Sequence, residues 1–337
     1  MANLRILVAP RLLARSDEAL ATLRPLARLA TYARDVARSR DLSSALFAAL
    51  GMRPDTPVAP LALLGRGGDP GDDYVICAEP VHLEAGSGHA LDVAIVSDLD
   101  SADADNLVQM LDRHFAADDV RFEPGCGTPW LARRAEASDV AMTTPEAAHG
   151  TMLAESLPRG RDAVRWRRWQ DEIAMLLHDH SVNRIREAGS LATVNAIWFF
   201  GGARLRDVGE VPQVVAGDAK GLVGDVVRGL ARLGAERCRA ARQATTSTRA
   251  DGTSRNARFV VDVAEAGTED AALARALADL EASHVDAVHL VAGGRTGAII
   301  TWRIPAPGAW RRIAARVKPR TLHVPTMDGR APRRPHR

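Results

Sequence analysis

The sequence predicts an α/β protein, with a mostly parallel central sheet, flanking helices and a smaller α+β subdomain. After residue 190, apolar segments of strand length alternate with helical segments, which is typical of parallel sheets. Between residues 74 and 115, two apolar strands precede one helix, which indicates the smaller unit. The apolar fraction of 46% in 337 residues is sufficient for a large core. The predicted segments are a helical N-terminal region (1–70), a small α+β subdomain (71–160), an α/β region (161–318) and a disordered basic tail (319–337).

The first half of the chain begins with a short apolar strand at residues 4–9. Ser16 is placed to cap a helix that we expect to run toward Val36, because a serine oxygen accepts from the first helical N–H groups. A second helix at residues 43–50 ends at Gly51, a residue type that tolerates the backbone of a helix end. The other predicted features are a loop at 65–73, strands at 74–83 and 90–97, a helix at 101–115, strand pieces within 122–134 and an irregular stretch at 143–160.

The second half contains the most regular predicted helix, residues 163–178, with Asp162 as its cap. Trp166 and Trp169 lie on its apolar face and are expected to belong to the core. The unbroken apolar run at 194–200 predicts a buried strand. The remaining predictions are strands at 214–215, 259–263, 287–292 and 298–304, helices at 218–233 and 271–282, and a mobile polar loop at 242–256.

Composition excludes several classes of protein. The 44 basic and 42 acidic residues give a net charge of +2, which argues against a dedicated nucleic-acid binder. No apolar run reaches the ~18 residues needed to span a bilayer, and the first residues lack the pattern of a signal peptide. The three cysteines form no CxxC pair and fit a reducing compartment. A cytoplasmic protein without membrane or nucleic-acid partners is therefore expected.

The densest polar chemistry of the chain lies in residues 176–202, LLHDHSVNRIREAGSLATVNAIWFFGG. A guanidinium in this stretch could hold a phosphate with two hydrogen bonds, and a glycine pair after a strand lets the backbone approach an anion. Local backbone bonding and a tight strand exit explain the same residues without a ligand. The candidate ligand-binding residues are His178, His180, Asn183, Arg186, Asn195, Gly201 and Gly202.

The two histidines fit either a metal site or the capping of a helix end. On a helix, His178 and His180 would point in different directions, so both could hold one ion only if the helix ends near Asp179. His82 and Glu79 could complete such a site, but the spacing matches no standard metal pattern. We therefore expect no metal and no cofactor. Near residue 220, Asp218 and Lys220 could serve a phosphate, or Asp218 could simply cap a helix.

Residues 176–202 resemble the pattern LLxDHPVNxxRxxxGxxxxNxxWxxGxG of archaeal-type, cofactor-independent phosphoglycerate mutases and their bacterial relatives. The bacterial relatives, which are described as phosphoglycerate mutases or as regulatory proteins of the RpfE type, are the more similar group. Ser181 stands where the pattern has proline. The segments AEPVHL and ITWRIPAPGAW are also similar to theirs. The matching residues are His180, Val182, Asn183, Arg186, Gly189, Asn195, Trp198, Gly201 and Gly202.

The resemblance implies a relationship to the alkaline phosphatase superfamily, whose mutases use two metal ions, a serine nucleophile and Asp and His ligands. Here the chain begins LRILVAP without an Asp-Gly turn, FVVDVAEAGTED retains only Asp262, and LVAGGRTGAII has no ligand. Without metals a phosphoryl group cannot be transferred in this way. The prediction is a pseudoenzyme with no catalytic residue, either regulatory or otherwise non-catalytic.

Such a protein would keep an anion pocket for a small phosphorylated metabolite or would bind a protein partner. The alternative is an active 2,3-bisphosphoglycerate-independent phosphoglycerate mutase, an isomerase. It would use an unfamiliar set of groups, drawn from His82, His178, Asp179 and His180.

Overall fold

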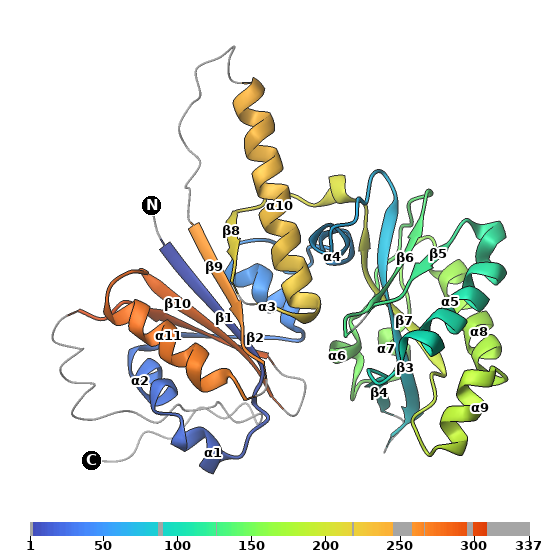
Figure 1. Cartoon of the computed structure of the whole chain (residues 1–337), viewed down its shortest axis with the longest axis horizontal. Coiled ribbons are helices and arrows are strands. Elements are labelled where there is room, and N and C mark those ends of the chain that lie inside the picture. The colour runs from blue at the N-terminus through green and yellow to red at the C-terminus, as the bar shows by residue number, and fades with distance from the viewer. Residues whose placement is uncertain are drawn as a thin grey trace.

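The computed structural model describes residues 3–86, 90–125, 127–217, 219–244, 258–265, 267–294 and 299–308. These residues form two lobes, each built around one β-sheet (Figure 1). The helix α4 (Ala59–Gly65) lies between the lobes, beside the long helix α10 (Gly221–Ala244). No helix of the described residues is both long and apolar enough to cross a membrane.

The larger sheet has the strand order β2-β11-β10-β1-β9-β8. Strands β10, β1, β9 and β8 pair in parallel, whereas β11 pairs antiparallel with β10 and β2. The α/β class is therefore confirmed, and the sheet combines a parallel centre with an antiparallel edge. The strands are β1 (Asn3–Leu13), β2 (Asp35–Ser39), β8 (Gln213–Ala216), β9 (Arg258–Val263), β10 (Ala287–Gly294) and β11 (Ile299–Pro305).

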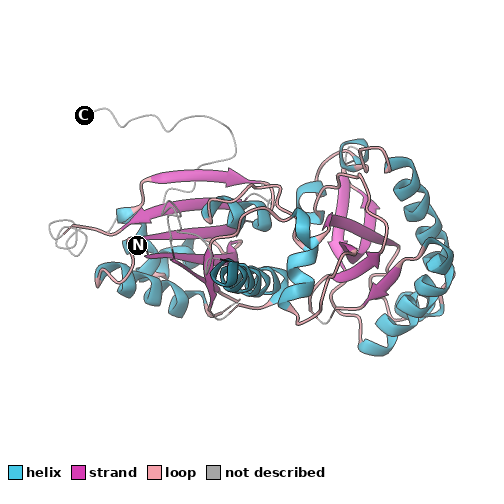
Figure 2. Ribbon diagram, turned by 90° about the horizontal axis from the view of Figure 1, so that it is seen from above, coloured by secondary structure: helices cyan, strands magenta, loops and turns pink. Residues whose placement is uncertain are grey.

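Helices cover both faces of the larger sheet (Figure 2). Alternate residues of β1 point to opposite faces, as the pleat of a strand requires. Leu7 packs in the cluster formed with α2 and α11, and Val8 packs in the cluster formed with α3 and α10. The helices of this lobe, besides α10, are α1 (Asp17–Thr22), α2 (Arg24–Tyr32), α3 (Leu42–Ala49) and α11 (Glu269–Glu281).

The smaller sheet is antiparallel, with the order β4-β3-β6-β5 and with β7 also paired to β3. Its outer face is covered by helices whose apolar side chains include the buried Trp166 and Trp169. Its strands are β3 (Tyr74–Ala85), β4 (Leu91–Ile95), β5 (Arg121–Glu123), β6 (Trp130–Arg134) and β7 (Ala196–Ala203). Its helices are α5 (Ser101–His114), α6 (Pro145–Ala148), α7 (Leu153–Ser156), α8 (Ala163–His178) and α9 (Ser181–Ala188).

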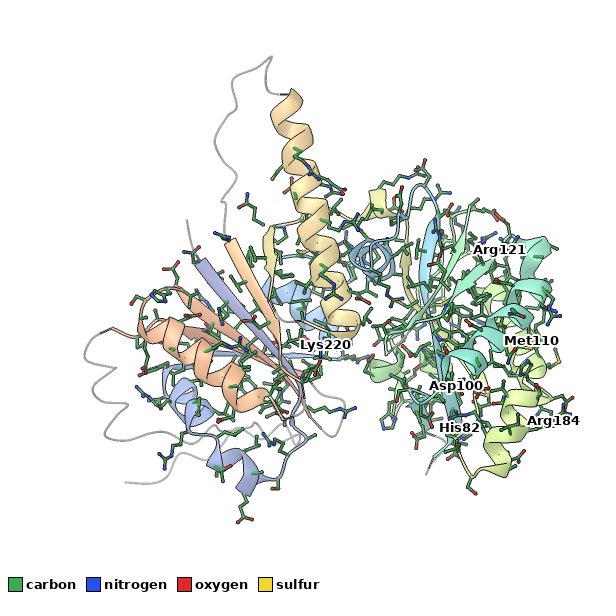
Figure 3. All side chains as sticks on the ribbon, viewed as in Figure 1. His82, Asp100, Met110, Arg121, Arg184 and Lys220 are labelled. Carbon is green, nitrogen blue, oxygen red and sulfur yellow. The ribbon has the colours of Figure 1, made fainter. Side chains whose placement is uncertain are left out.

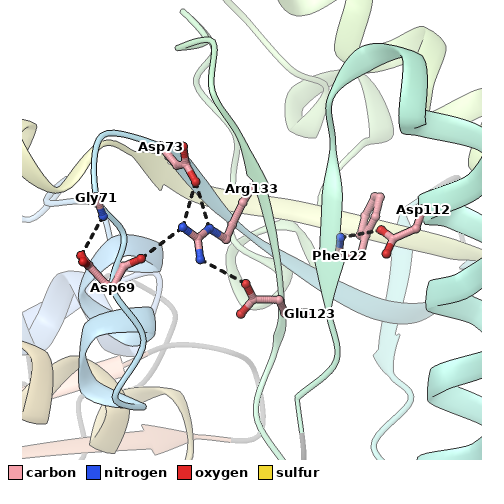
Figure 4. Close-up of polar contacts among 7 residues, drawn as sticks. All are labelled: Asp69, Gly71, Asp73, Asp112, Phe122, Glu123 and Arg133. Atoms are coloured by element: carbon pink, nitrogen blue, oxygen red, sulfur yellow. Dashed lines mark hydrogen bonds and ion pairs between the residues drawn. The ribbon is translucent and has the colours of Figure 1, made fainter.

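A basic side chain connects three parts of the smaller sheet at one edge (Figure 4). Arg133 on β6 donates from Nη2 to Asp73 Oδ2 at 2.8 Å and to the carbonyl of Asp69 at 3.1 Å. Its Nη1 lies 3.4 Å from Glu123 Oε1 on β5. The loop before β3 is thereby attached to β5 and β6.

The two lobes meet through an apolar interface in which helix backbones touch. A Cβ atom built on Gly65 of α4 would lie 1.8 Å from the carbonyl oxygen of Asp225 on α10. One built on Gly229 of α10 would lie 2.0 Å from the carbonyl oxygen of Leu61 on α4. Only glycine permits this approach. Val75 of β3 belongs to the same apolar cluster as α4 and α10, so the cluster spans both lobes.

Two predicted helix features need correction. The single helix expected from Ser16 toward Val36 is α1 followed by α2, and Val36 lies in β2. Pro25 lacks an N–H group, so it cannot continue α1 and instead occupies the first turn of a new helix. Ser16 caps α1 as predicted, accepting from Ala19 N at 3.2 Å. Asp162 precedes α8, but its side chain accepts from Asp139 N at 2.7 Å instead of capping the helix.

Strand pairing also departs from the predicted segments. The run predicted as a strand of the parallel sheet is β7, which pairs antiparallel with β3 in the smaller sheet. An apolar strand that is buried on both faces can belong to either sheet. The composition of β7 therefore does not predict that it pairs with β3. β1 and β2, from segment 1–70, belong to the larger sheet. The segment boundaries themselves stay a prediction. The tail and residues 245–256 of the predicted loop lie outside the described residues.

Candidate functional site

The polar groups of residues 176–202 are bonded mainly to the backbone around them. The buried Asn183 donates from Nδ2 to the carbonyls of Leu177, at 2.8 Å, and Val194, at 2.7 Å. Its Oδ1 accepts from Val194 N at 2.8 Å. Asn195 pairs in the same manner with both backbone groups of Leu83, at 2.8 and 2.9 Å. These two amides join the end of α8 and the start of β7 to β3.

Arg186 is buried and donates to two acceptors of its own lobe. Its Nε lies 2.7 Å from the carbonyl of Ala192, and its Nη2 lies 2.6 Å from Asp98 Oδ1. The guanidinium therefore holds the loop after α9 against the end of β4. Its side chain is 3% exposed, so an anion could reach it only by displacing these contacts.

The histidines of the predicted site lie apart from any described cavity. His180 is the N-cap of α9 and accepts from Val182 N at 3.3 Å, and burial lowers its pKa. His178 and Asp179 are exposed. His82 bonds through Nδ1 to the carbonyl of Thr193 at 2.8 Å and through Nε2 to Glu84 at 3.0 Å. Local bonding and capping thus account for the contacts of His82 and His180.

The glycine pair of this segment does line a cavity. Gly201 has φ of +63°, and a Cβ atom there would lie 2.3 Å from a side-chain carbon of Val58. A Cβ atom on Gly202 would lie 2.4 Å from the hydroxyl of Tyr74. Both glycines open onto a crevice between the lobes. Of the predicted site residues, only this pair lies in the crevice.

The crevice consists of three adjoining chambers, which we call basic, middle and acidic. The basic chamber has a volume of about 990 Å³, the middle chamber about 180 Å³ and the acidic chamber about 290 Å³. The basic and middle chambers share Asp41, Ser43 and Thr144. The middle and acidic chambers share Glu146, Phe200 and Leu222.

The basic chamber is rich in hydrogen-bonding side chains. Its acids are already bonded: Asp41 accepts from Ser44 N and Oγ, each at 2.8 Å, and Asp55 accepts from Arg53 Nη2 at 2.6 Å. A carboxylate at the start of α3 is also favoured by the helix dipole. The guanidinium and hydroxyl groups of the lining come from Arg38, Arg40, Ser39, Ser43, Ser44, Thr56, Thr143 and Thr144.

The middle chamber lies at the carboxyl ends of the parallel strands. Pro10 of β1 and Val263 of β9 line it from the larger lobe. Ligands of open α/β sheets characteristically bind outside this edge. Lys220 directly precedes α10 and lies at the lower end of that helix in Figure 3. Its ammonium is 3.1 Å from Glu265 and is largely exposed.

The acidic chamber contains two carboxyl groups in mainly apolar surroundings. Glu79 of β3 is 8% exposed. Burial, and then the charge of Glu146, raise the pKa of Glu79 to about 8, although Arg66 opposes the rise. Glu146 of α6 is exposed and lines both the middle and the acidic chambers. Desolvation there raises the pKa of Glu146 as well.

From the sequence, Glu79 is predicted only as a partner of His82 in a metal site. The stronger signal is its place on β3, where Val75, Cys77 and Val81 on the same face are all buried. A carboxyl group in a row of core positions is unusual. Among the described residues, no group of three or more His, Cys, Asp or Glu side chains lies together as metal ligands.

No protein-family model and no curated protein matches this chain. Among solved structures, the cofactor-independent phosphoglycerate mutase from Thermoplasma acidophilum is similar over 90% of this chain and 89% of its own, with 15% sequence identity and a TM-score of 0.37. The PH0037 protein from Pyrococcus horikoshii is similar over 90% of this chain and 87% of its own, with 12% identity and a TM-score of 0.47. Both TM-scores are too low to support a conclusion about fold or function.

Proposed function

We propose that this chain is a phosphoglycerate mutase-like protein that binds a small phosphorylated metabolite in the basic chamber without turning it over. Its role would be regulatory or otherwise non-catalytic. The observation that carries the proposal is that Gly201 and Gly202, which end the mutase-like motif, open onto the same chamber as Arg38 and Arg40. Membership of the bacterial RpfE-type group, the alkaline phosphatase relationship and a cytoplasmic location belong to the same proposal and rest on the sequence.

The chemistry of the basic chamber suits an anion. Guanidinium groups hold phosphate or carboxylate oxygens with two parallel hydrogen bonds. Arg38 and Arg40 are exposed. A phosphate can therefore bind their guanidinium groups without the cost of moving its charge into the protein interior. The two acids of the lining are bonded to Ser44 and Arg53. Their repulsion of a bound anion is reduced accordingly.

A non-catalytic role is supported by what the mutase-like residues do here. Asn183, Arg186 and Asn195 use their polar atoms on the backbone and on Asp98. Asp262, which remains from the family's ligand segments, pairs with Arg5 at 3.1 Å and lines none of the three chambers. The motif thus has a structural use in this chain that requires no turnover.

Calorimetric titration with 3-phosphoglycerate and with inorganic phosphate tests the binding. We expect measurable heat for the unaltered protein and about tenfold weaker binding for Arg40→Ala, because one charge-assisted contact is lost. Arg184→Ala is the matched control, because Arg184 is exposed on α9 in the smaller lobe, apart from Lys220 and the crevice (Figure 3). Absence of heat with both ligands would end the anion-binding proposal.

A coupled mutase assay, with and without added divalent metal, tests the non-catalytic part. We expect no turnover in either condition. Turnover together with stoichiometric bound metal would establish the alternative, an active 2,3-bisphosphoglycerate-independent mutase. In that case the basic chamber would be a substrate site.

A further inference from the structure

Glu79 interrupts an apolar row on the face of β3 that points toward the other lobe. Val75, Cys77 and Val81 on this face belong to the core that spans the lobes, and side chains of a strand alternate between faces. Glu79 makes no hydrogen bond or ion pair with any residue that the structure describes. A carboxyl group kept in a core without a partner lowers stability. Ionisable groups that lower stability in this way are often found in binding or catalytic sites.

The cavity in front of Glu79 has the composition of a binding site. It combines the carboxyl groups of Glu79 and Glu146 with apolar and aromatic walls. The faces of tryptophan and phenylalanine rings attract cations. The large apolar side chains of the wall are Ile95, Val96, Leu99, Trp130, Phe200 and Leu222, with Pro80 and Pro129 beside them.

The cations nearest to this chamber are already engaged. Arg66 donates from Nε to Asp225 Oδ2 at 2.7 Å and from Nη2 to the carbonyl of Pro129 at 2.8 Å. Lys220, on the far side of the middle chamber, pairs with Glu265. Asp225 and the buried thiol of Cys77 are the other titratable groups around Arg66 and Glu79. Among the residues that the structure describes, no free cation is therefore left to pair with the carboxyl groups of the acidic chamber.

We propose that the acidic chamber binds an organic cation, a primary ammonium or guanidinium group on a small apolar body, with Glu79 as the partner of the charge and Glu146 beside it. A phosphate or carboxylate would gain no opposite charge from these two groups and would be repelled by either of them once it ionises. A divalent metal usually takes more oxygen ligands than the two carboxyl groups offer. An apolar body explains the aromatic and aliphatic walls, which a bare inorganic ion would not use.

Binding of such a ligand has a defined proton balance. Near pH 7, Glu79 holds a proton, because burial and Glu146 raise its pKa to about 8. An ammonium ion forms a charged hydrogen bond with the ionised carboxylate. The carboxyl group plus R–NH₃⁺ therefore gives the carboxylate–ammonium pair and one proton, which passes to the solvent. Binding releases at most one proton for each ligand bound.

Benzylamine and benzyl alcohol form a matched pair of probes, equal in shape and different in charge. We expect calorimetry at pH 7 to show benzylamine binding about tenfold or more tightly than benzyl alcohol. Repeating the titration in buffers of different ionisation enthalpy measures the protons released, which we expect to approach one for each benzylamine and to be absent for benzyl alcohol.

The Glu79→Gln variant should lose about tenfold or more in benzylamine affinity and should release no proton. The Glu146→Gln variant should bind benzylamine several-fold more weakly, since the second carboxyl is lost. Glu155→Gln is the control, because Glu155 is exposed on α7 and lines none of the three chambers. Thermal melts show whether each variant folds. If Glu79→Gln does not fold, the proposal is tested by two other results. These are the proton release of the unaltered protein and the benzylamine affinity of the Glu146→Gln variant.

Benzylamine binding no tighter than benzyl alcohol would overturn the proposal, as would unchanged benzylamine affinity in a folded Glu79→Gln variant. Phosphate binding at Arg40 is independent of both results, because Arg40 and Glu79 line different chambers. Failure of one proposal is therefore distinguishable from failure of the other.

Discussion

The segment that joins α8 to β7 and the acidic chamber both hold polar groups in buried surroundings, but they differ in how those groups are satisfied. Asn183 bonds to three backbone groups, and Arg186 bonds to one carbonyl and one carboxylate. Glu79 is also buried, although slightly less so, and has no hydrogen bond or ion pair within the described structure. A dense cluster of polar residues can thus be structural, whereas the proposal of a binding site rests on one buried carboxyl group that lines a cavity without a partner.

The largest expected effect on stability comes from removing a buried side chain that makes several hydrogen bonds. Asn183→Ala should lower the free energy of unfolding by about 3 kcal/mol, because the buried N–H and carbonyl of Val194 lose their partner. The carbonyl of Leu177 loses one of its two donors and keeps His180 N. Urea denaturation measures the change. Arg184→Ala, one residue further along α9 and exposed, should change stability little. Equal stability of the two variants would show that the segment is not held as described.

Removing the ionisable group of Glu79, which lacks a partner, should increase the free energy of unfolding. The size of this increase depends on pH. Glu79 ionises near 4.5 in the unfolded chain and at about 8 in the folded one, so the folded state holds more protons between these values. The contribution of Glu79 to stability should therefore be greatest below about pH 4.5 and should fall as the pH rises to about 8. The Glu79→Gln variant should be more stable than the unaltered protein at pH 8, by on the order of 2 kcal/mol.

Thermal melts of both proteins at pH 4 and pH 8 measure this difference. At pH 4 the Glu79 carboxyl is protonated in both states, so the two proteins should differ much less than at pH 8. A difference of the same size at both values would mean that ionisation of Glu79 is not its cause.

A smaller loss is expected at the cap of α9. His180→Ala should cost about 1 kcal/mol, because Val182 N loses its acceptor. Burial lowers the pKa of His180, so the folded state favours the neutral ring, and this contribution should decline as the pH falls through the folded pKa. Urea titrations at pH 7.5 and pH 5 measure it. A larger loss at pH 5 than at pH 7.5 would contradict the capping role.

How far the fold can be predicted from the sequence depends on how far apart in the chain the contacting residues lie. Helices α5 and α8 and the strand pair β3–β4 follow from local periodicity, and the structure confirms them. The short helix α4 was not predicted, because six consecutive buried residues show no helical period. The pairing of β7 with β3 depends on contacts between residues more than a hundred positions apart, which local pattern does not contain.

The crevice could not be predicted for a similar reason. Its basic chamber joins residues 37–44, 54–58, 140–147 and 201–202, which approach one another only when the lobes assemble. The predicted set included Gly201 and Gly202, for which the strand-exit signal was local. The position of Glu79 in the alternating pattern of β3 does indicate an unusual buried carboxyl group. Its closeness to His82 in the sequence suggested a metal ligand instead.

We propose above that Glu79, a buried carboxyl group without a partner among the described residues, binds a cationic ligand. The most direct test is a carbon-13 NMR titration of its carboxyl resonance, assigned by comparison with Glu79→Gln, without and with saturating benzylamine. The account predicts a pKa of about 8 for Glu79 in the protein alone and a markedly lower pKa with the amine bound. Titration near the ordinary value of 4.5 in the protein alone, or a pKa unmoved by the amine, would contradict it.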